Sequence, residues 1–168
     1  MKEIMKKYRK AKGFTLVELL IVIIIIGILA GMMMLSTGSA TDKAEATKIV
    51  SDMRNVKSAA LMLYADTNLW LGSADVTKTA IGTELPSGKK LSDYLDTAPA
   101  GYSVAKTGGV CYVIYTGSED GNKLTQDNGI AKKLKDLTAS AGLYGSAPTA
   151  TSSPDYNGQA TVYMVIKK

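Results

Sequence analysis

One apolar segment near the amino terminus constrains this chain more than any other feature. Residues 14–35 have the sequence FTLVELLIVIIIIGILAGMMML, with a single charge at Glu18. As a helix this segment spans roughly 33 Å, enough to cross a bilayer core of ~30 Å. Isoleucine and valine favour strands in water, but in lipid a single segment pairs its backbone groups only as a helix. The segment therefore predicts a transmembrane helix rather than the buried helix of a soluble protein.

The positive charge of the chain lies before this segment. Residues 1–13 hold six of the 20 Lys and Arg residues and one of the 15 Asp and Glu residues, so they carry the whole net charge of +5. From Phe14 onward the charges balance. By the positive-inside rule, the amino end stays in the cytoplasm and the rest is exported. The basic composition is therefore no evidence for a nucleic-acid-binding body.

The composition also disfavours most enzymes. The chain has no histidine, the usual general base near neutral pH and the commonest metal ligand. Its one cysteine, Cys111, allows no internal disulfide. No Ser/His/Asp set, glycine-rich phosphate loop or paired-carboxylate site stands out. We expect no catalytic residues and no cofactor, with Cys111 a small core residue and an intersubunit disulfide the alternative.

The apolar segment has features of a signal peptide, but it departs from one in two ways. The triplet at 38–40, Gly-Ser-Ala, resembles a small-residue cleavage site. Against this, the segment exceeds the usual signal core, and it carries Glu18 close to its start. A charge near the middle of a membrane costs ~3 kcal/mol, which the position of Glu18 near the interface largely avoids. A carboxylate in a membrane segment indicates a functional site with a partner.

The junction before the apolar run resembles that of type IV pilins and related pseudopilins. Residues 12–20 are KGFTLVELL, followed by an isoleucine-rich run. The resemblance combines a short basic leader, a glycine before an aromatic residue, a glutamate at the fifth position after that glycine, and an uninterrupted apolar helix. It covers the first 35 residues closely and the rest of the chain loosely.

This resemblance implies a maturation and assembly sequence. Prepilin peptidase would cut between Gly13 and Phe14 on the cytoplasmic side and N-methylate Phe14. Glu18 would then pair with the amino terminus of a neighbouring subunit. Opposite charges ~4 Å apart at an effective dielectric of ~20 attract by ~4 kcal/mol before desolvation, so the pair selects register more than it adds stability. The alternative is that Glu18 is a tolerated interfacial charge.

The resemblance also implies the partners and the location. The chain would be a single-pass precursor in the cytoplasmic membrane, served by prepilin peptidase and an inner-membrane assembly platform. It would then join a helical homo-oligomeric filament, outside the cell or spanning the envelope. Gly27 and Gly31 form a G-x-x-x-G pattern, which suits close helix packing in the filament but is also common in membrane helices. Whether the helix kinks or melts on assembly stays open.

The rest of the chain predicts a small α+β head. Residues 36–66 continue as an amphipathic helix, with an apolar stripe at Ala46, Ile49, Val50, Met53, Val56, Ala60, Leu63 and Tyr64. Within the head, 67–168, the pattern predicts a mixed connection at 67–100 with a helical turn at 91–95. It also predicts a hairpin (102–106 and 110–116), a helix at 129–141 capped by Asn128, and a last strand at 160–166. The expected fold is a long helix packed on a three- or four-stranded antiparallel sheet.

Three further features of the head are weaker site candidates. Glu119, Asp120 and Asp127 cluster in one loop, and some pseudopilins bind calcium near the carboxy end, but the spacing matches no EF-hand and favours a solvated turn. Trp70 is expected to fill a local core position. Lysines of the 129–141 helix suit DNA phosphates on a fibre, although an exposed helix face is the simpler interpretation: Lys132, Lys133 and Lys135.

Taken together, the residues and the resemblance predict a structural subunit of a type IV pilus-like filament. One alternative is a pseudopilin of a type II secretion or DNA-uptake system. The other is an exported binding domain tethered by a signal anchor. The sequence leaves open whether the fibre serves adhesion, motility, DNA uptake or secretion.

Overall fold

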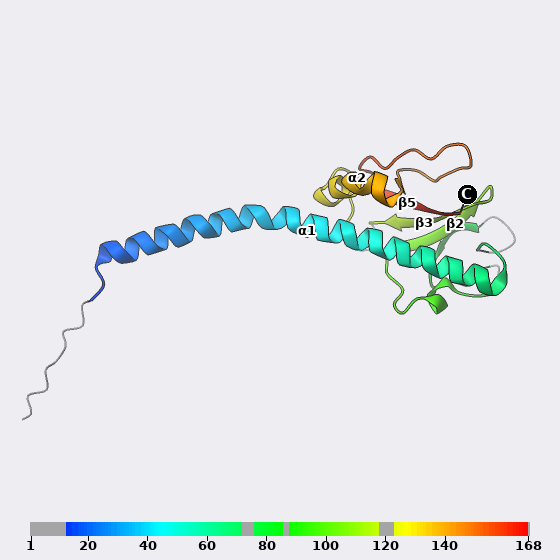
Figure 1. Ribbon diagram of the computed structural model, residues 1–168, viewed down its shortest axis with the longest axis horizontal. Helices are drawn as coiled ribbons and strands as arrows, with labels where there is room; N and C mark the ends of the chain where they lie inside the picture. The colour runs from blue at the N-terminus through cyan, green and yellow to red at the C-terminus, as the bar shows by residue number, and fades with distance from the viewer. Residues whose placement is uncertain (1–12, 72–75, 86–87, 118–122, 168) are drawn as a thin grey trace, which may run out of the picture. The chain divides into compact units, whose positions relative to one another are not determined.

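The computed structural model describes residues 13–71, 76–85, 88–117 and 123–167 (Figure 1). Two compact units emerge from the internal contacts, Met1–Gly38 and Ser39–Lys168. Helix α1, Leu16–Thr67, contributes to both of them. The Glu119 and Asp120 calcium candidates and the basic leader before Gly13 lie outside the described residues.

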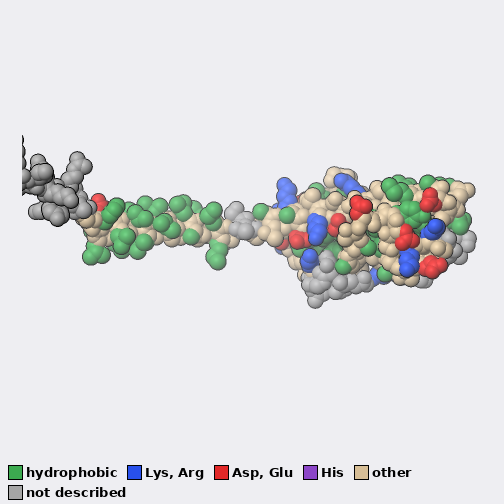
Figure 2. Space-filling view, turned by 90° about the horizontal axis from the view of Figure 1, so that it is seen from below, with side chains coloured by type: hydrophobic (Ala, Val, Ile, Leu, Met, Phe, Trp, Pro, Cys, Tyr) green, Lys and Arg blue, Asp and Glu red, His purple; other side chains and the backbone are tan. Residues whose placement is uncertain are grey.

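The described part of the first unit is mainly the apolar half of α1. Its large apolar side chains from Phe14 to Met34 are all exposed by half or more, and they cover the helix surface in Figure 2. This stretch of α1 is long and apolar enough to cross a membrane. Exposing this apolar surface to water would cost ~25 cal/mol per Å². These residues therefore require lipid or protein around them.

In the second unit, α1 buries one stripe of side chains. The buried residues recur at steps of three and four and join the main core cluster with the sheet: Ala46, Ile49, Val50, Met53, Val56, Ala59, Ala60 and Leu63. The predicted amphipathic stripe is confirmed except at Tyr64, which is only partly buried. This is the face that an amphipathic helix presents to a core.

The helix packs on a five-stranded antiparallel sheet of order β1-β2-β3-β5-β4. The strands are β1 (Val76–Ala80), β2 (Tyr102–Thr107), β3 (Val110–Thr116), β4 (Leu143–Tyr144) and β5 (Thr161–Lys167). Strands β2 and β3 form the predicted hairpin, from Tyr102↔Tyr115 to Thr107↔Val110. Gly108 and Gly109 turn the chain with positive φ at both positions, which the tight hairpin turn requires.

The predicted α+β fold is confirmed, and the sheet is larger than expected. Strand β1 lies within the stretch predicted as a connection, and β4 is two residues long and follows the second helix directly. Both flank the predicted strands at the two edges of the sheet, where pairing depends on tertiary contacts rather than on a local pattern. The predicted helical turn is the 3-10 helix η1, Leu91–Tyr94.

Helix α2, Gly129–Ala141, matches the predicted range. Asn128 caps it, because its side chain accepts a hydrogen bond from the Ala131 N–H at 2.8 Å. Gly142 ends the helix in the left-handed conformation, with φ of 66°. The carboxylate of Asp42 contacts Gly129 at the amino end of α2, where a negative charge is favourable.

Candidate functional site

Thr15 and Glu18 form reciprocal hydrogen bonds at the start of α1. The backbone N–H and the Oγ1 hydroxyl of Thr15 both donate to Oε2 of Glu18, each at 2.8 Å. In return, the Glu18 N–H donates to Thr15 Oγ1 at 3.2 Å. This reciprocal pair is a capping box, which satisfies backbone donors that the first helical turn leaves without partners.

This local role of Glu18 was not among the predictions from the sequence. The signal was present, since Thr-x-x-Glu before an apolar run is the sequence signature of a capping box. Both hydrogen bonds that Thr15 donates end on Oε2 of Glu18. The arrangement holds a carboxylate at a fixed place one turn into an otherwise apolar helix.

The junction at Gly13 and Phe14 lies just before this helix start. Neither residue has regular secondary structure, and the Phe14 side chain is 91% exposed. A Cβ on Gly13 would meet no atom within 4 Å. The backbone at Gly13 and Phe14 is therefore irregular and exposed.

Gly27 and Gly31 lie one turn apart on the exposed part of α1. A Cβ at either position would meet nothing within 4 Å. Within the unit itself, neither glycine is needed to avoid a clash. Their absence of side chains leaves a shallow strip of backbone on which another helix can lie closely.

The structure separates the weaker site candidates. Asp127 has φ of 56°, and its N–H donates to the Gly158 carbonyl at 3.0 Å, so it belongs to a closed turn. Across the described ranges, no group of three or more His, Cys, Asp or Glu side chains is placed to hold a metal ion. Cys111 is fully buried in the main core cluster, as the core interpretation predicts.

Trp70 packs at the end of α1 rather than standing alone. Its ring stacks on Tyr64 with the centroids 4.2 Å apart, and the Lys167 ammonium lies 5.5 Å from the Trp70 centroid. The side chain is partly buried against the main core cluster. The expectation of a local core position for Trp70 agrees with these contacts.

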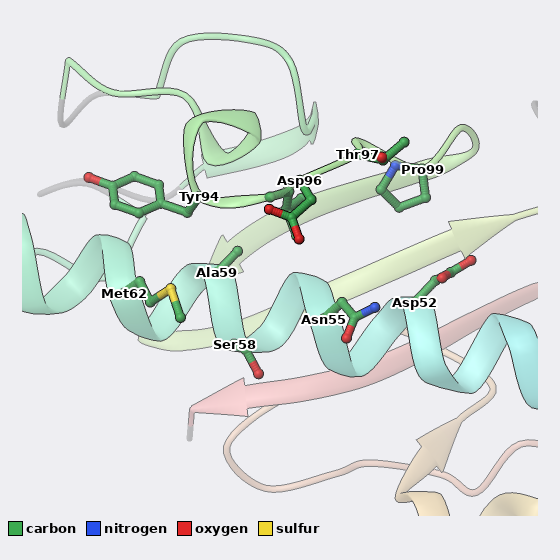
Figure 3. A pocket seen from close by; sticks show the side chains of 10 residues that line it. Asp52, Asn55, Ser58, Ala59, Met62, Tyr94, Asp96, Thr97 and Pro99 are labelled. Carbon is green, nitrogen blue, oxygen red and sulfur yellow. The ribbon is translucent and has the colours of Figure 1, made fainter.

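The head also carries a groove that the sequence did not reveal. It has a volume of about 560 Å³ and lies between α1 and the connection that follows η1 (Figure 3). Asp52, Asn55 and Met62 line it from α1, and Tyr94 and Asp96 line it from the other side. Residues from two distant segments form this groove, so only the tertiary fold brings them together.

A family model described as the prokaryotic N-terminal methylation motif matches residues 8–34. The fold is similar to that of the major type IV pilin PilA1 from Clostridium difficile, with a TM-score of 0.53 and 24% identity over 77% of this chain and 99% of that one. The type II secretion system core protein G of Escherichia coli K12 is 28% identical over 152 residues, 78% of this chain and all of that protein. The chain therefore carries this methylation motif, has a fold similar to that of a type IV pilin, and is similar in sequence to proteins named type II secretion system core protein G.

Other similar proteins match this pilin-like chain mainly over a shorter stretch. The type II secretion system core protein G of Vibrio cholerae is 36% identical over 66 residues, 39% of this chain. That of Klebsiella michiganensis is 42% identical over 55 residues, 33% of this chain. The matches span less than half of these two relatives, 45% and 39% of their lengths.

Proposed function

We propose that this chain is a structural subunit of a type IV pilus-like filament, polymerised through the apolar half of α1. The observation that carries the proposal is the apolar helix whose large side chains are exposed by half or more, joined to a methylation motif at residues 8–34. Such a helix has two stable surroundings, lipid before assembly and copies of itself afterwards. The chain is a substrate of processing enzymes rather than an enzyme.

Processing allows the helix to move from lipid into contact with copies of itself. Prepilin peptidase cuts between Gly13 and Phe14 on the cytoplasmic side and methylates the new amine of Phe14. Cleavage removes the basic residues of 1–13, which hold the amino end at the cytoplasmic face. The inner-membrane assembly platform then moves the freed helix into the fibre. The chain divides by role into 1–13 (leader), 14–35 (membrane and assembly helix), 36–66 (amphipathic helix) and 67–168 (head).

Glu18 guides this assembly by pairing with the amino terminus of a neighbouring subunit. The capping box supports this role, because it fixes the carboxylate before any partner arrives. An unpaired carboxylate inside a packed helix bundle is costly, so the pair selects one register among the sliding alternatives. Gly27 and Gly31 let the neighbouring helices approach closely.

A pseudopilin of a type II secretion system is the second candidate. The similarity of this chain to proteins named type II secretion system core protein G favours it. Both candidates share the processing step and the filament, and they differ in whether the fibre leaves the cell or stays within the envelope. Fluorescent labelling of cells with an exposed cysteine variant distinguishes a surface fibre from an envelope one.

Mass spectrometry of the mature amino terminus tests the proposal most directly. We expect a chain that starts at N-methylated Phe14 and carries residues 14–168. A start at Thr41 would indicate an ordinary signal peptide cut after Ala40. An intact Met1 would favour a tethered domain, and either result would overturn the filament proposal.

Two substitutions of Glu18 separate its capping role from its charge. The side-chain oxygen of glutamine can accept the two hydrogen bonds from Thr15 but carries no charge, whereas alanine loses both the hydrogen bonds and the charge. We expect Glu18→Gln to keep helix content in membranes while filaments are lost, and Glu18→Ala to reduce both. Normal filaments from Glu18→Gln would remove the pairing role that we give to the carboxylate.

A further inference from the structure

Helix α2 presents a basic face at one edge of the sheet. Helix α2 carries three lysines and one aspartate, and it contacts the edge strand β4. Lys132 and Lys135 are exposed, and they lie three residues apart on one helix face. This face presents two ammonium groups at the β4 edge of the sheet.

The groove lies toward the opposite edge. Tyr94 ends η1, and the Ser92 N–H of η1 donates to the carbonyl of Ile81 at 3.1 Å, directly after β1, the other edge strand of the sheet. Two of the ten residues that line the groove are carboxylates, Asp52 and Asp96, and none is basic. A third carboxylate, Asp66, accepts a hydrogen bond from the Tyr94 hydroxyl at 2.8 Å. A smaller adjoining cavity of about 240 Å³ shares Asp52 and includes Lys48 on its lining.

The groove is shaped for long basic side chains. Two apolar residues of α1 line it, Met62, which is 56% exposed, and Ala59, which is buried. Figure 3 shows Asp52 on α1 and Asp96 on the facing connection. A lysine buries its aliphatic stem on apolar surface and keeps its ammonium near polar groups, which Met62 and the two carboxylates provide together.

We infer that the groove of one copy receives Lys132 and Lys135 from α2 of the next copy in the filament. The contact sets two ammonium groups against Asp52 and Asp96. This inference rests on the filament function proposed above and adds a second interface, between heads, to the one formed by α1.

The positions of the two surfaces fit a filament rather than a closed dimer. A two-fold dimer needs one surface that is complementary to itself, whereas here the complementary surfaces lie at opposite edges of one head. In a head-to-tail contact, the copy at one end of the fibre keeps an empty groove and the copy at the other end keeps an unpaired α2. Further copies can therefore be added. A single exposed ion pair is weak, but its repetition along a fibre makes many such pairs significant.

Cysteine cross-linking of assembled filaments tests the contact. The only native cysteine, Cys111, is buried, so introduced cysteines react alone. Filaments of Asp96→Cys/Lys135→Cys and of Asp96→Cys/Lys132→Cys are treated with a short bismaleimide. We expect a ladder of covalent multimers from at least one pairing. Each single-cysteine variant is the matched control and cannot extend beyond a dimer.

A charge swap provides the second measurement. We expect Lys132→Glu/Lys135→Glu to lower the yield of sheared filaments by about fivefold or more, the effect of losing two exposed ion pairs. Adding Asp52→Lys/Asp96→Lys to the same chain should restore the yield. Lys89→Glu/Lys90→Glu changes the net charge equally, away from α2, and should not lower it. Processing at Phe14 should be the same in all of them.

These outcomes separate the contact from the filament function. If the unmodified chain forms no filaments, the proposed function is wrong. If it forms filaments but no ladder appears from either pairing, the head contact is wrong and the filament function stands. Equal filament yields from the lysine double variant and the unmodified chain, at low and at high salt, would also overturn the contact.

Discussion

Gly117, the residue after β3, has no room for a side chain. A Cβ at this position would contact the backbone N and O and the Cβ of Leu124, a buried residue. Backbone atoms cannot rotate away as a side-chain tip can. We therefore expect Gly117→Ala to lower the free energy of unfolding by about 1–3 kcal/mol, the usual cost of overpacking. Fluorescence of Trp70 during urea unfolding of the full chain in detergent measures the effect.

Gly82→Ala is the matched control for this substitution. A Cβ on Gly82 would meet nothing within 4 Å, and its φ is not positive. We expect its free energy of unfolding to stay within about 0.5 kcal/mol of the original. An equally small loss of unfolding free energy for Gly117→Ala would contradict the prediction, because it would mean that Leu124 can move away at little cost.

Tyr156 gives the head a sensitivity to alkaline pH. Burial, helped by the negative charge of Asp127, raises the pKa of its phenol well above the usual value. The unfolded chain ionises this phenol near pH 10, whereas the folded chain keeps it neutral to higher pH. The contribution of neutral Tyr156 is therefore fully present below about pH 10 and is lost as the pH rises, at up to about 1.4 kcal/mol per pH unit.

Phenylalanine at this position should remove that pH dependence. The Tyr156 hydroxyl donates to the Gln159 carbonyl, so Tyr156→Phe costs about 1 kcal/mol at neutral pH. Above pH 10 its unfolding free energy should fall less steeply than that of the original chain. Urea titrations at pH 8 to 11.5 compare the slopes, with Tyr163→Phe as the control. Parallel slopes for Tyr156→Phe and the original would contradict the assignment.

Among the elements, α2 depends on the residue that caps it, Asn128. The side chain of Asn128 accepts from the Ala131 N–H and also donates to the Lys123 carbonyl at 2.9 Å. Asn128→Ala should cost about 1 kcal/mol of unfolding free energy, the usual value of a lost cap. Asn128→Asp keeps an acceptor at this place and should cost less. Thermal unfolding followed by circular dichroism ranks the two, and an equal loss for both would place the effect elsewhere than in the cap.

The elements that the sequence predicted are those with a local signal. Helix α2 has an asparagine before it and a glycine after it, and the β2–β3 hairpin has a Gly-Gly turn between β-branched runs. Strand β1 contains Lys78 and pairs with β2 through a shifted register, so no alternation marks it. Strand β4 is two residues that follow α2 and pair with β5. The pairing, not the composition, makes these two segments strands.

The candidate sites also differ in whether a local sequence signal marks them. The junction at Gly13 and Phe14 and the carboxylate of Glu18 are local features, and the sequence alone was enough to single them out. The groove was not foreseeable, because Asp52 and Asp96 come from segments far apart in the chain and meet only in the fold. The hydrogen bonds from Thr15 to Glu18 follow from the Thr-x-x-Glu spacing, which is a local signal as well.

At the scale of the whole molecule, the two units have different sources of stability. The described side chains of the first unit, from Gly13 to Met34, are all exposed, so this unit gains its stability from its surroundings. The second unit has its own core, in which α1 residues such as Met53 and Leu63 meet the sheet. A chain of this kind can exchange lipid for protein around its first unit without rebuilding the second.

Cys111 reports whether the second unit opens as a whole. Its thiol is fully buried in the cluster that joins α1, the sheet and α2, so a reagent reaches it only when that cluster separates. For a domain of ordinary stability, we expect labelling of the native chain to be slower than that of the unfolded chain by about a thousandfold or more. Timed maleimide labelling read by mass spectrometry measures the ratio. Lys89→Cys in a Cys111→Ala chain is the exposed control and should label at the unfolded rate. Rapid labelling of native Cys111 would mean that the core opens locally around β3.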